Sequence, residues 1–146
     1  MKLLITGSRN GHPYVECAID AFIAEFDIPE EFILGCANGV DAQANAFCYR
    51  RGYNKAIFVA NWRKYGNDAG KRRNERMVQD CEGGGDDMFL AFPSGESRGT
   101  KHCMTLALFH GMEGWSVNTT GQFFVLWKKT NNHCTVLTRK TNVFVL

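Results

Sequence analysis

Hydrophobic positions in this chain fall into short apolar runs that alternate with longer amphipathic stretches. Apolar runs of strand length predict four β-strands, at Lys2–Thr6, Glu31–Leu34, Lys55–Ala60 and Met88–Phe92. Apolar residues at helical spacing predict helices over Pro13–Asp27, from Val40 through Ala44 to Phe47 and Cys48, and over Gly99–His110. The polar segment Asn61–Arg76 predicts a loop followed by a helix whose apolar face is formed only at its end, by Met77, Val78 and Cys81.

The regular alternation of strands and helices predicts a parallel sheet. Each helix must cross back over the sheet in a right-handed sense before the next strand begins. We therefore expect an α/β fold, a Rossmann-like parallel sheet sandwiched by helices. Ligands of such sheets bind beyond the carboxyl ends of the strands, where neighbouring crossovers go to opposite faces. Four loops should meet there, at 7–9, 35–41, 61–65 and 93–100.

The alternation ends after Trp115. Three β-rich runs follow, Gln122–Lys128, His133–Arg139 and Asn142–Leu146, separated by Thr130–Asn132 and Lys140–Thr141. They predict an antiparallel hairpin or small meander at the sheet edge. We divide the chain into a Rossmann-like part, 1–118, and a β-rich extension of the same domain, 119–146. The aromatic residues of this extension are explained either by edge packing or by a dimer surface.

Composition narrows the class of protein. The 146 residues, 45% hydrophobic and 22% charged, are enough for one domain with its own core. The net charge of +2 does not require a nucleic acid partner. The six cysteines contain no C-x-x-C pair, and the histidines have no metal-like spacing, so we expect reduced cysteines, no metal and no cofactor. The start of the chain predicts a strand, and no apolar run has the length of a membrane span, so we expect a cytoplasmic protein.

The segment Asp87–Lys101 has the pattern of a ligand site. The apolar run Met88–Phe92 stops at Pro93, a loop with Gly95 and Gly99 follows, and a helix begins. In a strand, glycine loop and helix of this kind, the first amides of the helix and the positive end of its dipole attract an anion. Arginine, lysine and hydroxyl side chains in the loop add donors. We interpret this loop as a phosphate-binding cradle.

Residues from all four converging loops are candidates for the same site. The predicted ligand-binding residues are Gly7, Ser8, Arg9, Gly35, Asn38, Gly39, Asp41, Trp62, Tyr65, Arg73, Asn74, Gly95, Ser97, Arg98, Gly99, Thr100 and Lys101. Asp41 is explained equally well as a helix-capping carboxylate, with Asn38 as the cap, or as a ribose ligand. The two aromatic residues of the third loop could stack on a base or only anchor their loop. Lys71, Arg72 and Arg76 fit a solvated helix face. His102, near the start of a helix, could contact phosphate, although a lone histidine usually has a structural role.

Four motifs in order carry a resemblance to a known family. They are Leu4-Ile5-Thr6-Gly7-Ser8-Arg9, Gly35-x-Ala37-x-Gly39-Val40-Asp41-x-x-Ala44, Trp62-x-x-Tyr65-Gly66-x-x-Ala69-Gly70-x-x-Arg73-Asn74-x-x-Met77, and Ala91-Phe92 with Gly95-x-Ser97-Arg98-Gly99-Thr100-Lys101-His102. From Met1 to about Val117 the chain resembles the small YspA-like branch of the SLOG superfamily. That superfamily also contains the Lonely-Guy phosphoribohydrolases and the DNA-processing protein DprA.

The resemblance implies a domain that binds nucleotide-derived ligands, often as a homodimer. In the Lonely-Guy enzymes a motif of the type Pro-Gly-Gly-x-Gly-Thr-x-x-Glu supplies a catalytic glutamate. The matching loop here runs from Pro93 to Thr100, is longer, and places Cys103 at the glutamate position. A thiol stabilises an oxocarbenium-like sugar poorly. Glu96, Glu75 or Asp41 could substitute for the missing carboxylate, but their spacing does not place them.

Three functions follow as expectations. The first is a module that binds a nucleotide or an ADP-ribose-derived, phosphate-containing small molecule, as a sensor or to sequester it. The second is a nucleotide N-glycosidase or phosphoribohydrolase, disfavoured by Cys103. The third, single-stranded DNA binding of the DprA kind, needs an extended basic groove with aromatic platforms. The small net charge makes a nucleic acid partner the least favoured of the three.

Overall fold

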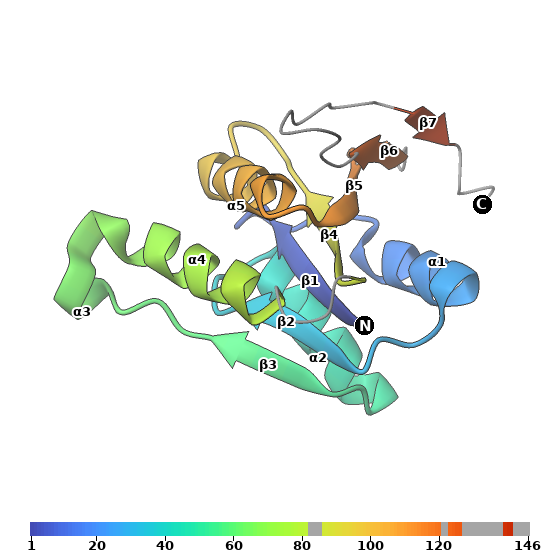
Figure 1. The fold of residues 1–146 in the computed structure, drawn as a ribbon, viewed down its shortest axis with the longest axis horizontal. Coiled ribbons are helices and arrows are strands. Elements are labelled where there is room, and N and C mark those ends of the chain that lie inside the picture. The colour runs from blue at the N-terminus through green and yellow to red at the C-terminus, as the bar shows by residue number, and fades with distance from the viewer. Residues whose placement is uncertain (82–85, 121–122, 127–138, 142–146) are drawn as a thin grey trace.

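The described strands form a single twisted sheet. The computed structural model describes residues 1–81, 86–120, 123–126 and 139–141 (Figure 1). Its strands are β1 (Lys2–Gly7), β2 (Glu31–Gly35), β3 (Lys55–Phe58), β4 (Met88–Phe92), β5 (Glu113–Val117), β6 (Phe123–Leu126) and β7 (Arg139–Thr141). Their order in the sheet is β3-β2-β1-β4-β5-β6-β7. The first five are parallel, and β6 and β7 are antiparallel to their neighbours. The predicted Rossmann-like α/β fold is confirmed.

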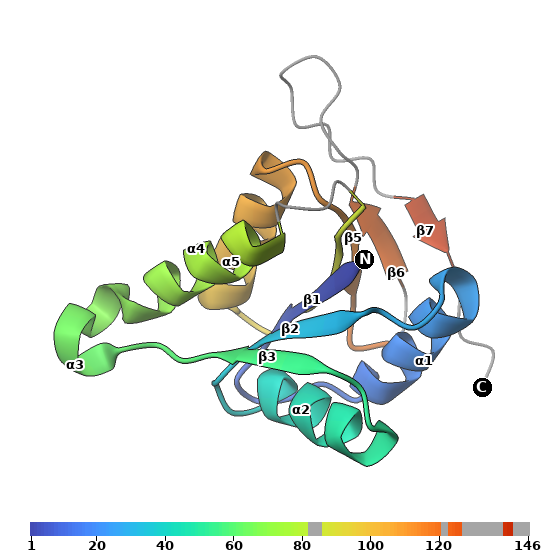
Figure 2. The same cartoon turned by 60° about the horizontal axis from the view of Figure 1, so that its bottom comes forward.

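Helices cover both faces of this sheet (Figure 2). They are α1 (Val15–Phe26), α2 (Val40–Arg51), α3 (Trp62–Tyr65), the 3₁₀ helix η1 (Gly66–Asp68), α4 (Ala69–Cys81) and α5 (Arg98–Phe109). Leu3 and Ile5 of β1 pack in one core cluster with α1 and α2, and Leu4 packs in another with α4 and α5. Successive strand residues point to opposite faces, so an almost continuously apolar strand supplies both cores.

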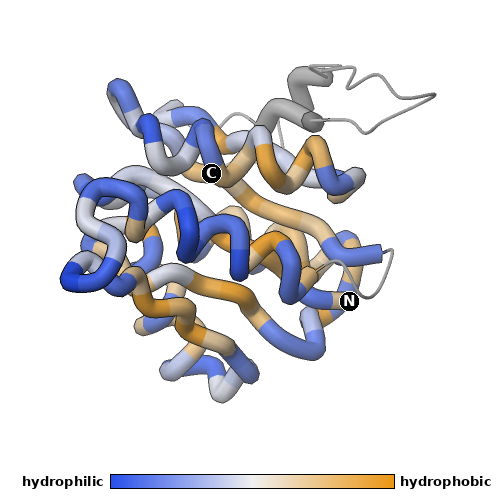
Figure 3. Tube along the Cα trace, turned by 60° about the vertical axis from the view of Figure 1, so that its left-hand side comes forward, coloured by the Kyte–Doolittle hydropathy of each residue, from blue (hydrophilic) through white to orange (hydrophobic). Residues whose placement is uncertain are grey.

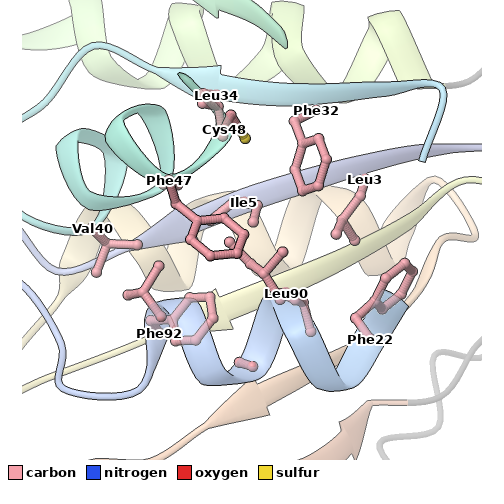
Figure 4. Close-up of a cluster of buried hydrophobic side chains, with 14 of the residues drawn as sticks. Leu3, Ile5, Phe22, Phe32, Leu34, Val40, Phe47, Cys48, Leu90 and Phe92 are labelled. Atoms are coloured by element: carbon pink, nitrogen blue, oxygen red, sulfur yellow. The ribbon is translucent and has the colours of Figure 1, made fainter. Parts of the chain in front are cut away.

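The larger core lies between the sheet and the helices α1 and α2. Figure 4 shows Phe32, Phe47 and Phe92 from three different elements meeting in this cluster, and each is at most 1% exposed. Burying a side chain of this size stabilises the fold by about 1.5–3 kcal/mol. The hydropathy of the chain follows the same layers, with the most apolar segments running through the middle of the molecule (Figure 3).

One strand was missed by the sequence analysis. β5 has the sequence Glu-Gly-Trp-Ser-Val and continues the parallel sheet beside β4. Its low apolar content gives no strand pattern in the sequence. The strand forms because it pairs with β4 on one side and β6 on the other. Gly114 lies against the ring of Phe89, and a Cβ there would be 2.5 Å from that ring. The close approach of the two strands explains a glycine inside β5.

The C-terminal extension pairs with β5 where it is described. The expected strand Gln122–Lys128 is confirmed in its centre, as β6. The predicted separator Lys140–Thr141 was wrong, because both residues belong to β7 and pair with Phe123 and Phe124 of β6. The rest of the runs His133–Arg139 and Asn142–Leu146 lies outside the described residues. β6 and β7 extend the same sheet, consistent with an extension of one domain.

Helix α4 is preceded by helical turns where the sequence predicts a loop. It begins at Ala69, directly after α3 and η1, so most of the expected loop in the segment 61–76 is helical. Its buried residues are Ala69, Arg73, Asn74, Met77, Val78 and Cys81, which lie at helical spacing. Polar residues occupy the first half of this buried stripe, which is why only its apolar end was recognised. The longest described helix has 13 residues, and none of the described helices is long and apolar enough to cross a membrane.

The topology creates one preferred ligand position. From β1 the chain builds outward through α1, β2, α2 and β3, and then returns to place β4 on the other side of β1. The crossover helices α1 and α2 lie on one face of the sheet, and α4 and α5 lie on the other. The order therefore reverses between β1 and β4. In open α/β sheets ligands bind beyond the carboxyl ends of the strands at this reversal.

Candidate functional site

A cavity of about 540 Å³ lies at this reversal. Its volume is in the range of about 300–1,000 Å³ that is typical of small-molecule sites. The lining includes residues from the loops after β1, β2 and β4, Trp62 from the segment after β3, and the first turns of α4. The predicted convergence of four loops is confirmed in the geometry of this cavity.

Most of the predicted ligand-binding residues line this cavity. They are Gly7, Ser8, Arg9, Asp41, Trp62, Arg73, Asn74, Gly95, Ser97, Arg98, Gly99 and Thr100. The others lie outside its lining. Asn38 borders a small adjoining hollow with Arg9 and Trp62, and Tyr65 borders a separate groove. Lys101, Gly35 and Gly39 do not belong to the lining either.

Three of the predicted glycines have packing roles that the structure makes explicit. A Cβ on Gly35 would lie 2.6 Å from Asp41 Oδ2 and 2.8 Å from Arg73 Nη1, so the glycine makes room for both side chains. A Cβ on Gly7 would overlap the side chain of Val40, and one on Gly39 would overlap the carbonyl oxygen of Ser8. These positions need the absence of a side chain because two segments approach closely. Their role as direct ligand contacts stays a prediction.

Two buried charged residues form part of the cavity wall. Asp41 is 7% exposed and Arg73 is 8% exposed. Asp41 Oδ2 accepts a hydrogen bond of 3.1 Å from the amide of Ala37, so the carboxylate does hold the turn before α2. The predicted cap at Asn38 was wrong, because Gly39 is the N-cap residue and no side chain caps the helix. Arg73 donates from Nε to Asn74 Oδ1 at 3.0 Å, and its Nη1 lies 3.6 Å from Cys36 Sγ.

Burial shifts the pKa of Asp41. It raises the pKa of the carboxyl, and the positive charges of Arg73 and Arg9 together with backbone hydrogen bonds oppose this shift. The net direction is upward, so the charged form is less favourable in the folded protein than in water. Asp41 is thus a carboxylate that the fold keeps at some cost in stability. A buried carboxyl with a perturbed pKa in a cavity wall is a candidate for a functional residue.

Asn74 connects α4 to the glycine loop. Its Nδ2 donates to the carbonyl oxygen of Gly99 at 3.2 Å and lies 3.3 Å from Nδ1 of His102. The donor Arg73 Nε and the acceptor Gly99 O together fix which end of the amide is oxygen. His102 Nδ1 must then be an acceptor, which leaves the ring proton on Nε2. Burial and the charge of Lys71 lower the pKa of His102, in agreement with a neutral ring.

The first turn of α5 borders the cavity with unused donors. Lys101 N donates to Ser97 O at 3.0 Å, but the amides of Arg98, Gly99 and Thr100 have no acceptor in the described part of the chain. Ser97 is the N-cap residue, and its hydroxyl contacts Ser94 instead of the helix amides. Thr100 is 3% exposed. A Cβ on Gly99 would meet nothing within 4 Å, so open space lies beside its Cα.

The rim of the cavity is aromatic and cationic. The guanidinium of Arg9 lies 5.5 Å from the ring centroid of Trp62, which is 48% exposed. Arg98 lies 3.8 Å from Glu96, and both side chains are 89% exposed. The charged lining residues are Arg9, Lys71, Arg73 and Arg98 on the positive side and Asp41 and Glu96 on the negative side. Positive charge therefore dominates the cavity.

Cys103 does not take part in this site. It is fully buried in the core cluster with Leu4, Ala91 and Ala107, and it does not line the cavity. Burial raises the pKa of its thiol to about 12. The thiolate is the reactive form of cysteine, so a thiol with this pKa is inert at neutral pH. Of the carboxylates that could replace a catalytic glutamate, Glu75 borders a different groove, and Glu96 is exposed at the rim.

The cavity also contains residues that were not predicted as site residues. They are Thr6, Asn10, Ala37, Asn67, Gly70, Lys71, Met77, Ser94, Glu96 and His102. The sequence assigns Lys71 to a solvated helix face, and for His102 it favours a structural role over a phosphate contact. The helical spacing from Arg73 to Gly70 and Met77 is the signal that could have found these two residues of α4. In the described ranges, no group of three or more His, Cys, Asp or Glu side chains could hold a metal ion.

Asp41→Asn is expected to stabilise the protein at neutral pH. The folded-state pKa is raised, so the folded protein holds its proton more tightly than the unfolded chain does. Stability is then highest below the unfolded pKa of about 4 and is lost as the pH rises through the folded pKa. Urea denaturation of both proteins between pH 4 and 8 should show a gain for Asp41→Asn that shrinks on acidification.

The matched control is Asp68→Asn, at an exposed carboxylate on η1. This change should alter stability by no more than about 0.5 kcal/mol at any of these pH values. A loss of stability in Asp41→Asn at pH 7 would mean that the bond to Ala37 and the attraction of Arg73 outweigh the cost of burial.

Comparison with known proteins identifies a phage relative. No protein-family model matches the chain. The Gene 61 protein of Mycobacterium phage D29 is 39% identical over 110 residues, a match that covers 70% of this chain and 85% of the phage protein. Identity at this level over most of the phage protein shows common descent. The chain belongs to the same family as the Gene 61 protein of Mycobacterium phage D29.

Proposed function

We propose that the protein binds a nucleotide or an ADP-ribose-derived, phosphate-containing small molecule in the cavity between β1 and β4. One observation carries this proposal. The buried guanidinium of Arg73 and the unused amides at the start of α5 border the same cavity. An anion bound there would accept hydrogen bonds from both and would lie at the positive end of a helix dipole.

A phosphate group suits these donors energetically. Among the described residues, no carboxylate forms an ion pair within 4 Å of Arg73. Asp41 and Arg73 nevertheless both lie against Gly35. Asp41 is near enough to attract Arg73 without a direct ion pair, so part of the cost of burying the guanidinium is not compensated. A phosphate oxygen would supply further negative charge and form charge-assisted hydrogen bonds. The open space at Gly99 lets such a group approach the backbone.

The remaining lining residues suit the rest of a nucleotide. Trp62 offers a partly exposed aromatic ring for a base. Asp41 lines the same cavity, and a ribose hydroxyl could donate a hydrogen bond to its carboxylate. These features support a nucleotide over a simple oxyanion.

From the resemblance we also propose membership of the SLOG superfamily. We further propose that the protein is a homodimer, and light scattering during size-exclusion chromatography would measure its oligomeric state.

A second candidate is hydrolysis of an N-glycosidic bond. It is favoured by Asp41, a buried carboxylate with a raised pKa in the cavity, since a general acid or base works best with a pKa near the working pH. It is disfavoured by the buried, inert Cys103 at the position of the family glutamate. Release of free base from a nucleoside monophosphate, lost in Asp41→Asn, would favour the enzyme over the binding module.

A nucleotide of the right kind is expected to raise the melting temperature of the protein. Binding at 100 times Kd stabilises the native state by about 2.7 kcal/mol. For a chain of this size each kcal/mol corresponds to roughly 2–4 °C, so a shift of roughly 5–10 °C is expected. The measurement is a thermal-shift panel of nucleoside mono-, di- and triphosphates and ADP-ribose.

Variants connect the shift to the cavity. Thr100→Ala removes a buried hydroxyl of the lining, and Arg9→Ala removes a cation of the rim. Both should reduce the shift while leaving the melting temperature of the ligand-free protein within a few degrees. A panel without any shift would count against the proposed function, and a shift untouched by both variants would place the ligand elsewhere.

A further inference from the structure

A second cationic hollow lies beside the first. It is a groove of about 700 Å³ between the end of β3, α3 and the outer side of α4, and we call it the α3–α4 groove. Its lining residues are Val59, Ala60, Asn61, Trp62, Arg63, Lys64, Tyr65, Arg72, Glu75, Arg76 and Gln79. The groove thus contains four cations and one carboxylate.

None of the four cations of this groove forms an ion pair with a described carboxylate. No carboxylate lies within 4 Å of Arg63, Lys64, Arg72 or Arg76. On α2, by contrast, Arg50 pairs with Glu16 and Arg51 pairs with Asp20. Like charges gathered without partners repel one another. A surface that keeps them together is suited to an anion.

Several of these side chains are held in place before any ligand binds. The guanidinium of Arg72 lies 4.3 Å from the ring centroid of Tyr65, and Lys64 Nζ lies 5.1 Å from the same ring. Arg76 donates to the carbonyl oxygen of Val59 at 2.6 Å. Long cationic side chains usually lose conformational freedom on binding, so groups already ordered by aromatic and backbone contacts bind at a lower entropic cost.

Trp62 joins the α3–α4 groove to the cavity. This residue lines both hollows. It stands on α3, the short helix that leads from β3 toward α4 (Figure 1). A ligand that stacks on this ring therefore has a cationic surface on either side of it. The cavity has the volume of a site for one small molecule, so the groove is available to a further part of the same ligand.

We propose that the α3–α4 groove is a second phosphate subsite, so that the ligand carries a second phosphoryl group on the far side of the base or sugar that lies at Trp62. This inference rests on the proposed function, because the cavity is assigned the first phosphate. The chemical class is a nucleotide with two separated phosphoryl groups. A 5′-phosphorylated dinucleotide has this arrangement, because one nucleoside lies between its 5′-phosphate and its phosphodiester. The two phosphoryl groups of ADP-ribose are directly linked, so ADP-ribose cannot place them on opposite sides of a ring at Trp62 and serves as the comparison.

Affinity measurements on the full chain test the subsite. The probes are the nucleoside 5′-monophosphates of the four common bases, the matching 5′-phosphorylated dinucleotides, and ADP-ribose, measured by isothermal titration calorimetry. The groove variant is Arg63→Ala combined with Arg72→Ala. The control is Arg50→Ala combined with Arg51→Ala, which removes the same charge from α2, on the other face of the sheet.

We expect the wild-type protein to bind a 5′-phosphorylated dinucleotide at least about tenfold more tightly than the monophosphate, the gain of one charge-assisted hydrogen bond. The groove variant should lose this gain and keep the monophosphate affinity within about twofold, and the control should keep both. A plot of log affinity against log salt concentration has a negative slope for the dinucleotide. In the groove variant this slope should become less steep by about 0.7 for each phosphate that the variant no longer neutralises. Arg72→Gln alone, which preserves much of the packing on Tyr65, should show part of the same loss.

Three results would overturn the subsite. These are equal affinities for monophosphate and dinucleotide, equal losses in the groove variant and the control, and a loss of monophosphate binding in the groove variant. If ADP-ribose gains as much as the dinucleotide and loses that gain in the groove variant, the second phosphoryl group lies directly beside the first and not across Trp62, and the proposed subsite is also wrong. If monophosphate binding depends on Arg73 but the dinucleotide gains nothing, the subsite fails and the proposed function stands. If no probe binds, both fail.

Discussion

Gly39→Ala is expected to destabilise the fold by about 3 kcal/mol, from backbone strain and steric overlap together. Gly39 has φ 76° and ψ −123°, a conformation essentially restricted to glycine. A Cβ there would also overlap the carbonyl oxygen of Ser8, which accepts a hydrogen bond of 3.0 Å from the amide of Val40. The added methyl group would push the loop after β1 away from the start of α2.

The matched control is Gly52→Ala at the other end of the same helix. Gly52 has φ 71° and ψ 25°, and a Cβ there would meet nothing within 4 Å. This left-handed conformation costs a residue with a side chain about 1–2 kcal/mol. Urea denaturation of the two variants should therefore give the larger loss for Gly39→Ala. Equal losses would mean that the contact with Ser8 relaxes freely and that Gly39 does not position the loop.

This prediction also bears on the cavity. The loop held by Gly39 contributes Ser8 and Arg9 to its wall. A displaced loop should weaken ligand binding in Gly39→Ala, whereas Gly52→Ala should leave it unchanged. Glycines of this kind act on function through the backbone, without a contact of their own.

The fold was readable from the sequence wherever the elements bury apolar residues in a regular pattern. The run Met88–Phe92 is buried on both faces of the sheet and was predicted with its observed bounds. β5 was not predicted, because three of its five residues are Glu, Gly and Ser and its formation depends on pairing with β4. Hydrophobic patterns in a sequence indicate which residues are buried. They do not predict a strand that forms mainly because it pairs with neighbouring strands.

The site was readable where a loop carries its own signal. The order of strand, glycines and helix predicted the glycine loop before α5, and residues of this loop line the cavity. Lys71 and His102 carry no such signal, since their positions depend on how α4 packs beside α5. Arg73 and Asn74 carry a weaker sequence signal than the glycine loop does. They are polar residues at buried helical positions, a conflict between local pattern and burial that often marks a functional site.

Arg73→Met is expected to weaken binding of a phosphate-containing ligand by at least about 10- to 100-fold. A hydrogen bond to a charged group contributes about 1.5–3 kcal/mol, and each 1.4 kcal/mol corresponds to a factor of ten. Burial strengthens this contribution, because Arg73 is 8% exposed and water screens it little. Methionine keeps a long, unbranched side chain in the same space, so the packing of α4 against the sheet should be largely retained.

The control variant is Arg98→Met, the same substitution at another arginine of the same cavity. Arg98 is 89% exposed and lies 3.8 Å from Glu96. An exposed charge in water contributes no more than about 1 kcal/mol, so this variant should lose less than about fivefold. Calorimetric titration of both variants with the nucleotide that gives the largest thermal shift measures the two losses. Equal losses, or a greater loss in Arg98→Met, would show that the phosphate lies at the rim and not against the buried guanidinium.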